Sequence, residues 1–398
     1  MSLQAINNSG INIPLSLKTW AIEKGSATGL LYDSINDNSF AINYPLTLVQ
    51  DKEEYSNYQI FLLKNKFGTK DDHYFVLNID GKRKGIFFPI KVFSDPSNLP
   101  LPADDKFLYR FLHIAFYHLL SGTTVASNVI DYTLLTEDPA LQIESFYDDE
   151  TVVLLYFNEL NPLDLFDIKK FYPSLLKLGY VPILSASDFA EIEMLNVSSN
   201  KSPLYSYTPQ SNINLTAVKS TIIDEQYIIQ VFETLTKYRL TPLLRFIILY
   251  QVIELLINKI AVEYYKNNNP FSAQLSAMMI NTHSAPTFRD ILEKITHIQS
   301  EIAKSVSIKK EESRINILFG EKCKFDIADY LELQATAKMM LGTLDCKTLT
   351  DYIYQLRNRI THNYHNLSIT YTNLNDLLFD FNLEFEKFIA DIIINYEQ

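Results

Sequence analysis

The pattern of apolar and polar positions changes near the middle of the chain. Up to about residue 215, apolar residues form short runs broken by Asn, Ser, Gly and Asp, which is typical of strands joined by turns. After residue 220, apolar residues recur at helical spacing over longer stretches. The pattern therefore predicts an α+β domain over residues 1–215, followed by an all-α helical bundle over residues 216–398.

The clearest β region of the first half lies between residues 55 and 93. Three β-rich runs, at 58–63, 73–79 and 85–92, are separated by polar segments, one of which is the hairpin turn 80–82. Because the runs follow one another closely, we expect them to form an antiparallel meander.

The rest of the first half predicts a mixture of elements. Residues 151–184 have the order strand, helix, strand, and this order predicts a parallel pair of strands. No Gly-rich phosphate loop accompanies them. The other expected elements are short strands and loops over 1–50, a helix over 106–120 and a linker over 196–216.

The second half predicts an up-and-down bundle of helices with mostly short connections. Pro242 lies in the first turn of the longest helix, where its missing N–H group costs nothing. Residues 307–322 are polar and predict a loop. The expected helices are 222–237, 241–267, 287–306, 325–341, 348–364 and 373–396.

The helix over 348–364 carries the residues best suited to chemistry. Arg357 suits phosphate oxygens because its planar guanidinium stays charged. His362 suits proton transfer because histidine is the side-chain type that ordinarily gains and loses a proton near neutral pH. Asn358 lies four residues before His362, on the same helix face, where its amide could orient the imidazole. Arg357 and His362 are five residues apart, so about 140° separates them around a straight helix.

Four further residues complete the candidate site. Arg359 and His365 form a second, overlapping pair, and Tyr364 could stack on a base. Glu254 lies within an apolar helix stretch, where a charge should be paired, and we expect it to meet Arg357. Each of these residues also has an ordinary interpretation as a polar residue of a helix surface or an interface.

The spacing Arg357, polar Asn358, His362, Tyr364 resembles the Arg-x4-His-x-Tyr signature of the HEPN superfamily. The resemblance implies a metal-independent endoribonuclease in which two copies of the motif face each other across a homodimer groove. An acidic residue on the first long helix is common in that family, as Glu254 would be here. The resemblance to larger HEPN proteins implies a toxin or an anti-phage, abortive-infection effector. A partner antitoxin that modifies Tyr364, or a phage-derived trigger, would then control it.

Composition limits these functions. The net charge is −12 and both halves are acidic, so RNA binding would depend on a local basic site around Arg357 and Arg359. Two cysteines without ligand spacing predict no metal, and no cofactor is expected. A reducing, cytoplasmic compartment follows, without a signal peptide or a membrane span.

Two alternatives stay open. The bundle could be a non-catalytic HEPN dimerisation or adaptor unit, with the acidic first domain binding a protein partner. The first domain could itself be an enzyme, although no set of residues within 1–215 indicates a reaction. His113 and His118 lie five apart on the helix 106–120 with no carboxylate at ligand spacing, which predicts core or surface positions and not a metal site.

Overall fold

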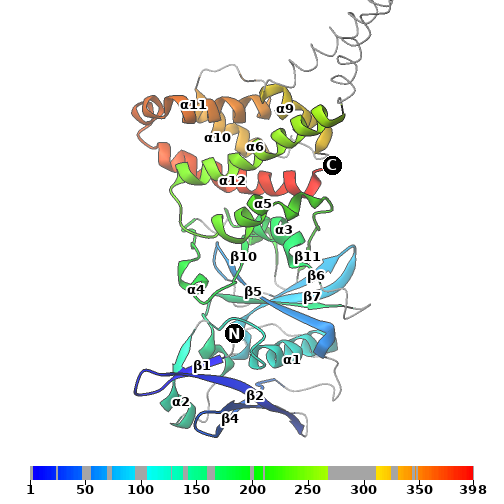
Figure 1. Cartoon of the computed structure of the whole chain (residues 1–398), viewed down its shortest axis with the longest axis vertical. Helices are drawn as coiled ribbons and strands as arrows, with labels where there is room; N and C mark the ends of the chain where they lie inside the picture. The colour runs from blue at the N-terminus through cyan, green and yellow to red at the C-terminus, as the bar shows by residue number, and fades with distance from the viewer. Residues whose placement is uncertain are drawn as a thin grey trace, which may run out of the picture. The chain divides into compact units, whose positions relative to one another are not determined.

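The structure is a computed structural model of the chain, and it divides into two compact units (Figure 1). The sheet unit comprises Met1–Ala217 and Phe232–Arg239, and the helical unit comprises Val218–Val231 and Leu240–Gln398. An N-terminal region rich in sheet is thus followed by a helical region. The residues described are 3–23, 26–46, 55–69, 74–94, 105–126, 128–137, 142–158, 166–197, 201–208, 211–267, 311–323, 330–342, 346 and 348–397.

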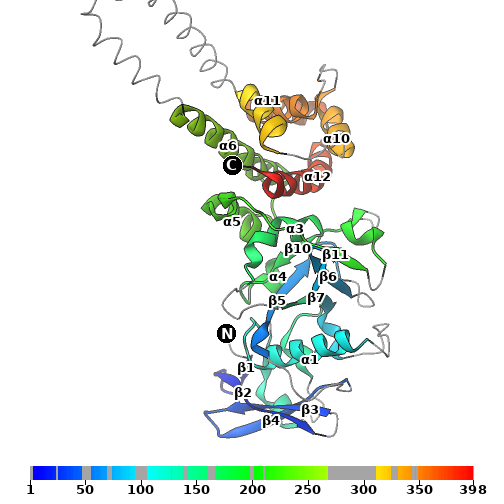
Figure 2. The ribbon, with the colours of Figure 1, turned by 90° about the vertical axis from the view of Figure 1, so that its right-hand side faces the viewer.

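The sheet unit has three layers, a helix between two sheets (Figures 1 and 2). The first sheet has the order β4-β3-β2-β1-β8, with β8 parallel to β1 and the other pairs antiparallel. Its strands are β1 (Leu3–Ile6), β2 (Asn12–Glu23), β3 (Ser26–Asp33), β4 (Asn38–Asn43) and β8 (Val129–Asp131). The strands over 12–43 are longer than the short runs that the sequence predicted.

The second sheet has the order β10-β5-β9-β7-β6-β11. Its strands are β5 (Tyr58–Asn65), β6 (Phe75–Ile79), β7 (Lys82–Pro89), β9 (Thr151–Phe157), β10 (Tyr180–Pro182) and β11 (Asn212–Asn214). Helices α2 (Tyr132–Glu137), α3 (Tyr172–Lys177) and α4 (Asp188–Glu191) also belong to this unit.

Helix α1 (Lys106–Leu120) has the bounds that the sequence predicted and contacts strands of both sheets. Asp105 caps its first turn by accepting a hydrogen bond from the backbone N–H of Leu108 at 3.0 Å. A helix between two sheets must be apolar on two faces, and α1 is. Its buried residues are Leu108, Phe111, Leu112, His113, Ile114, Ala115, Phe116, Leu119 and Leu120.

The predicted meander is wrong in its strand order. The hairpin between β6 and β7 is present, with Asp80 and Gly81 at positive φ in the turn, but β5 does not pair with either strand. Strand β9, some sixty residues further along the chain, lies between β5 and β7 and is antiparallel to both. Which strands become neighbours in a buried sheet depends on how the faces of the sheet pack, and local sequence does not encode this packing.

The parallel β–α–β pair and the linker also differ from the prediction. Strands β9 and β10 are both antiparallel to β5 and lie on opposite sides of it, so they are not neighbours. Residues 196–216 are not an independent linker, because β11 within them pairs in parallel with β6. Ile213 of β11 is fully buried, and one apolar residue among polar ones was too weak a signal to predict a strand.

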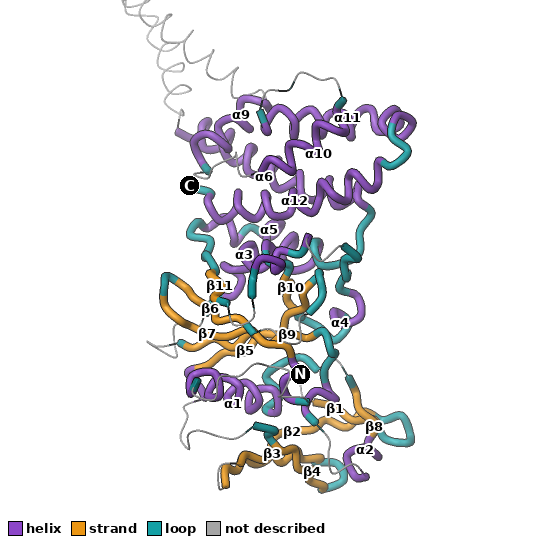
Figure 3. Tube along the Cα trace, turned by 180° about the vertical axis from the view of Figure 1, so that it is seen from behind, coloured by secondary structure: helices purple, strands orange, loops and turns teal. Residues whose placement is uncertain are grey.

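The helical unit contains α5 (Gln226–Gln230), α6 (Pro242–Asn267), α9 (Glu311–Ile317), α10 (Leu331–Leu341), α11 (Leu349–Thr370) and α12 (Leu374–Asn395) (Figure 3). Helix α12 packs on α6 and α10, and α11 packs on α10 and α9. The core between α6 and α12 contains the rings of Phe246, Phe381 and Phe385, whose centroids are 5.1–5.8 Å apart. None of the described helices is long and apolar enough to cross a lipid bilayer.

Two predictions for the helical region need correction. Residues 222–237 are helical only in part and not one α-helix, because a 3-10 turn at Thr221–Asp224, α5 and a π-helical turn at Val231–Leu235 follow one another. The segment Phe232–Arg239 also belongs to the sheet unit, where Lys237 forms a buried ion pair with Asp188. Residues 307–322 are not all loop, since α9 and a π-helical turn at Leu318–Lys322 lie there, with Leu318 and Phe319 buried. The helix expected over 287–306 lies outside the described residues.

Candidate functional site

Helix α11 places the candidate residues. Its N-terminus is a capping box, in which the hydroxyl of Thr348 accepts from the Asp351 N–H at 3.1 Å and the Asp351 carboxylate accepts from the Thr348 N–H at 3.0 Å. Ile353, Leu356 and Ile360 are buried at helical spacing and hold one face of α11 against its neighbours. This buried seam fixes the rotation of the helix, and therefore the directions in which the polar residues point.

Arg357 reaches from α11 to α6. Its Nη2 atom donates to Oε1 of Glu254 at 2.9 Å, and its guanidinium lies 5.7 Å from the ring centre of Tyr250, one helical turn before Glu254. The side chains of Arg357 and Glu254 are 22% and 37% exposed, respectively. The contact that the sequence predicted between these residues is therefore present, and both side chains are partly exposed to solvent.

Asn358 does not take the position that the sequence suggested. Its Oδ1 atom accepts a hydrogen bond from Arg357 Nη1 at 3.2 Å, and no hydrogen bond joins it to His362 within the described residues. The long arginine side chain reaches an adjacent residue that does not share its helix face. Asn358 thus helps to orient the guanidinium instead of the imidazole.

His362 is exposed and makes no hydrogen bond or ion pair within the part of the chain that the structure describes. The helix is regular from Arg357 to His362, so their separation of about 140° is kept. Asn363 then departs from helical geometry, with φ −136° and ψ 27°. This kink follows His362 and cannot bring it toward Arg357. One chain therefore does not bring Arg357 and His362 together.

The remaining candidates lie around the same end of α11. Arg359 and Tyr364 are half-buried, and His365 is exposed. Beyond the kink, the described residues of α11 are mostly exposed, apart from buried Leu367. The imidazoles and Tyr364 thus lie on an accessible helical segment, whereas Arg357 is held against α6.

Sequence reasoning missed three residues of this cluster. Tyr227 of α5 donates to Gln251 Oε1 at 2.7 Å and approaches the Ile248 carbonyl oxygen at 2.8 Å. Burial, and then the charge of Glu254, raise the pKa of Tyr227 to about 12, so it stays protonated. Tyr250 and Gln251 could have been found from their spacing to Glu254 on one helix. Tyr227 could not, because only the fold brings α5 to α6.

The other titratable groups of the described residues do not form a metal site. Within the described residues, no group of three His, Cys, Asp or Glu side chains could hold a metal ion. His113 is buried among the rings of Trp20, Tyr44 and Tyr55, and burial lowers its pKa to about 4. The Nε2 atom of His118 lies 3.1 Å from the Tyr55 carbonyl oxygen. His113 is therefore a core position of the sheet unit, whereas His118 is half-buried.

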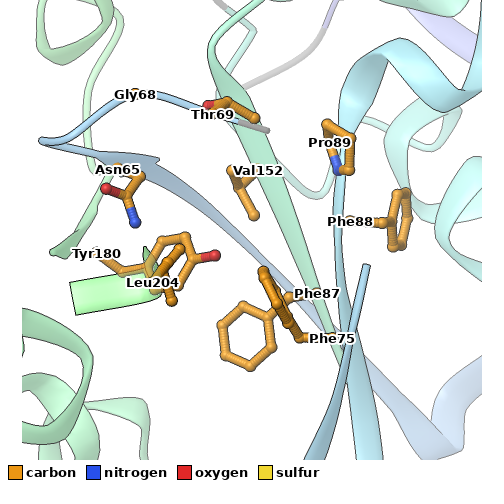
Figure 4. A pocket seen from close by; sticks show the side chains of 10 residues that line it. All are labelled: Asn65, Gly68, Thr69, Phe75, Phe87, Phe88, Pro89, Val152, Tyr180 and Leu204. Atoms are coloured by element: carbon orange, nitrogen blue, oxygen red, sulfur yellow. The ribbon is translucent and has the colours of Figure 1, made fainter. Parts of the chain in front are cut away.

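One small cavity of the sheet unit lies over the second sheet, between Tyr180, Phe75 and Phe87 (Figure 4). Its volume is about 10 Å³, which is room for about one water molecule. Asn65 lies at the rim of the cavity, and its side chain is already hydrogen-bonded within the protein. Its Nδ2 atom donates to the Leu178 carbonyl at 3.0 Å, and its Oδ1 atom accepts from the Phe67 N–H at 2.9 Å. The cavity is too small to be a substrate site.

The chain was compared with family models, curated proteins and solved structures, and none of them matches it.

Proposed function

We propose that this protein is a metal-independent endoribonuclease of HEPN type, with a composite active site formed by two copies of the chain. The observation that carries the proposal is the state of Arg357, whose guanidinium is oriented by Glu254, Asn358 and the Tyr250 ring yet remains partly exposed. A cation that is oriented in advance and partly exposed to solvent is suited to bind a phosphate that becomes more negative during reaction.

The chemistry follows from the two side-chain types. The His362 imidazole would act as the base and take the proton of a ribose 2′-OH, whose oxygen attacks the adjacent phosphorus while the 5′-oxygen leaves with a proton from an acid. The partner copy's equivalent imidazole can supply that proton. Arg357 would stabilise the charge on the phosphorane oxygens. The products are a 2′,3′-cyclic phosphate and a 5′-hydroxyl end, without a metal.

The geometry of a single chain supports the need for two copies. Arg357 contacts α6, whereas His362 is exposed to solvent. The two side chains leave the same helix in directions about 140° apart. A second α11 across a groove would add its own His362 and Arg357 to each phosphate. Arg359, Tyr364 and His365 would then contact the RNA strand, with Tyr364 available for stacking or for modification by an antitoxin.

The test is RNA cleavage by the purified full-length protein in the presence of EDTA. We expect cleavage products with cyclic phosphate ends, and a loss of about a hundredfold to a thousandfold in rate for Arg357→Ala and for His362→Ala. Arg239→Ala changes an exposed arginine of the sheet unit and is the matched control. Absence of cleavage of any cellular RNA, or equal rates for the three variants, would contradict the proposal.

A second candidate is a non-catalytic adaptor that uses the same bundle for dimerisation. It is favoured by one observation, that Arg357 already has a carboxylate partner while His362 has no described group to orient it. Growth on expression separates the two. A ribonuclease that serves as a toxin or an abortive-infection effector in the cytoplasm should arrest growth only with an intact Arg357 and His362, with or without a phage-derived trigger. An adaptor should not.

A further inference from the structure

The sheet unit has an edge strand that stops early. Strand β10 pairs with only three residues of β5, from Tyr180 opposite Asn65 to Pro182 opposite Leu63. One more hydrogen bond, from Ile183 N–H to the Leu62 carbonyl at 2.9 Å, extends this pairing. The first half of β5 therefore lies beyond the end of β10.

Asp188 ends β10 at this point. Its Oδ2 atom accepts from the backbone N–H groups of Leu184 at 2.7 Å and Ser185 at 3.0 Å, which turns the chain away from β5. Asp188 is itself held by Lys237 at 2.8 Å and by the Tyr238 hydroxyl at 2.8 Å. A buried ion pair therefore fixes the end of the edge strand, and the edge beyond it is built into the fold.

The backbone of Ile60 points toward that edge. In an antiparallel ladder the N–H and C=O groups of alternate residues face alternate neighbours. Leu62 accepts from Ile183 and Lys66 N–H donates to the Gly179 carbonyl at 2.9 Å, so the even-numbered residues of β5 face β10. Ile60 is next in this alternation, and no described strand pairs with it on that side. Neither Gln59 nor Phe61 supplies a charge that would protect the edge.

A pocket of about 170 Å³ lies at the same edge. It is lined by Ile60 and Leu62 of β5, by Pro182 at the end of β10, by Leu184 just beyond it, and by Thr124 and Tyr172. Leu184 is 48% exposed although it is a large apolar residue. A dry apolar cavity of about 150 Å³ can hold a benzene molecule, so this pocket has room for one large apolar side chain.

We propose that this edge binds an extended peptide of a partner protein, which pairs with Ile60 and places one large apolar side chain in the pocket. Backbone groups that no described strand pairs, beside a pocket lined mainly by apolar side chains, are the two parts of recognition by strand addition, in which backbone hydrogen bonds give affinity and the pocket gives selectivity. A small apolar molecule would fill the pocket but leave the Ile60 N–H and C=O groups unused. The sheet unit would therefore be a peptide receptor, whichever function the helical unit has.

The probe is a fluorescent, acetylated and amidated heptapeptide, Lys-Thr-Val-Phe-Val-Thr-Lys, titrated into the full-length protein. Two matched peptides separate the contributions. Central Ala in place of Phe should weaken binding by about tenfold or more, since the anchor is lost. N-methylation of the central amides should abolish binding because it removes strand pairing. Binding should also slow hydrogen exchange in the segment 58–63.

The protein variants are matched as well. Leu184→Lys places a charge at the pocket and should weaken binding by about tenfold or more. Leu134→Lys changes a leucine of α2 that is 47% exposed, compared with 48% for Leu184, and should bind as the wild type does. If Leu184→Lys lowers the melting temperature of the protein, Thr123→Tyr is tested in its place. Thr123 lies exposed at the rim of the pocket, and a tyrosine there should fill the pocket.

Three results would overturn the proposal. In the first, the Phe peptide does not bind at its highest soluble concentration. In the second, N-methylation of the peptide leaves its binding unchanged. In the third, the Leu184→Lys and Leu134→Lys variants bind the peptide equally well. A wild-type protein whose self-association is lost in Leu184→Lys would assign the edge to a second copy of the chain, which also overturns the partner-peptide proposal. These outcomes do not depend on whether the protein cleaves RNA.

Discussion

Each unit contains a carboxylate paired with a cation, and the two pairs differ in burial. In the sheet unit, Asp188 and Lys237 are 2.8 Å apart, with side chains only 1% and 2% exposed. In the helical unit, Glu254 and Arg357 are 2.9 Å apart and 37% and 22% exposed. The distances are nearly equal, so distance alone does not distinguish a structural pair from a pair available for chemistry.

The surroundings explain what each pair can do. Burial alone would raise the pKa of Asp188, but hydrogen bonds from Lys237, the Leu184 N–H and Tyr238 outweigh it and hold that pKa below its usual value of 3.8. The oxygens of Asp188 are committed to protein donors. The Arg357 guanidinium keeps solvent access, so it could exchange solvent for a phosphate without unfolding anything. Full burial of an ion pair thus stabilises the fold, whereas partial burial leaves the charged group accessible to solvent.

The largest effect on stability is expected at the buried pair. Asp188→Ala leaves the Lys237 ammonium buried with the Pro182 carbonyl as a weaker acceptor at 3.3 Å, and should lower the free energy of unfolding by about 3–5 kcal/mol. Urea denaturation measures this. Asp149→Ala is the control, because Asp149 is 75% exposed in its pair with Lys91 and should change stability by less than about 1 kcal/mol. If Asp188→Ala and Asp149→Ala lower the free energy of unfolding by similar amounts, burial does not decide how much an ion pair contributes to stability.

A pH effect of about 3 kcal/mol is expected from His113. Burial lowers its pKa in the folded protein to about 4, compared with the ordinary value of 6.5 for a histidine in an unfolded chain. Between these values the unfolded chain binds a proton that the folded chain does not, so stability is present above pH 6.5 and falls as the pH drops toward 4. Stability measured from pH 7 to pH 4 should fall by about 3 kcal/mol more in the wild type than in His113→Phe. Parallel curves for the two proteins would show that His113 is not the cause.

The smallest stability effect is expected at the half-exposed pair. Glu254→Gln keeps the shape of the side chain and should cost less than about 1 kcal/mol, although under the proposed function it misorients Arg357 and lowers the rate of RNA cleavage. Glu386→Gln on α12 is the comparison, since its pair with Arg245 of α6 is only 8% exposed at each side chain and its loss should cost more. A Glu254→Gln variant that unfolds as readily as Glu386→Gln would make the Arg357 pair structural.

Part of the candidate site could be predicted from sequence because it depends on local rules. Glu254 within an apolar helix needs a partner, and Arg357 is the cation that meets it. The orientation of Asn358 could not be predicted, because helical spacing places it near His362 while the reach of Arg357 decides its actual partner. Tyr227 was missed because its contact to Gln251 depends on how α5 packs on α6.

The sequence by itself determined the elements whose ends are encoded within a few residues: α1 after its Asp105 cap, α6 from Pro242, and the start of α11 at the Thr348 capping box. Only the tertiary structure decided that β9 lies between β5 and β7, and that Phe232–Arg239 belongs to the sheet unit. The physical reason is the distance along the chain between the residues that interact. A cap or a helix face is satisfied by neighbours three or four residues away, whereas the partner of a strand or of a buried charge such as Lys237 is chosen by the whole packed core.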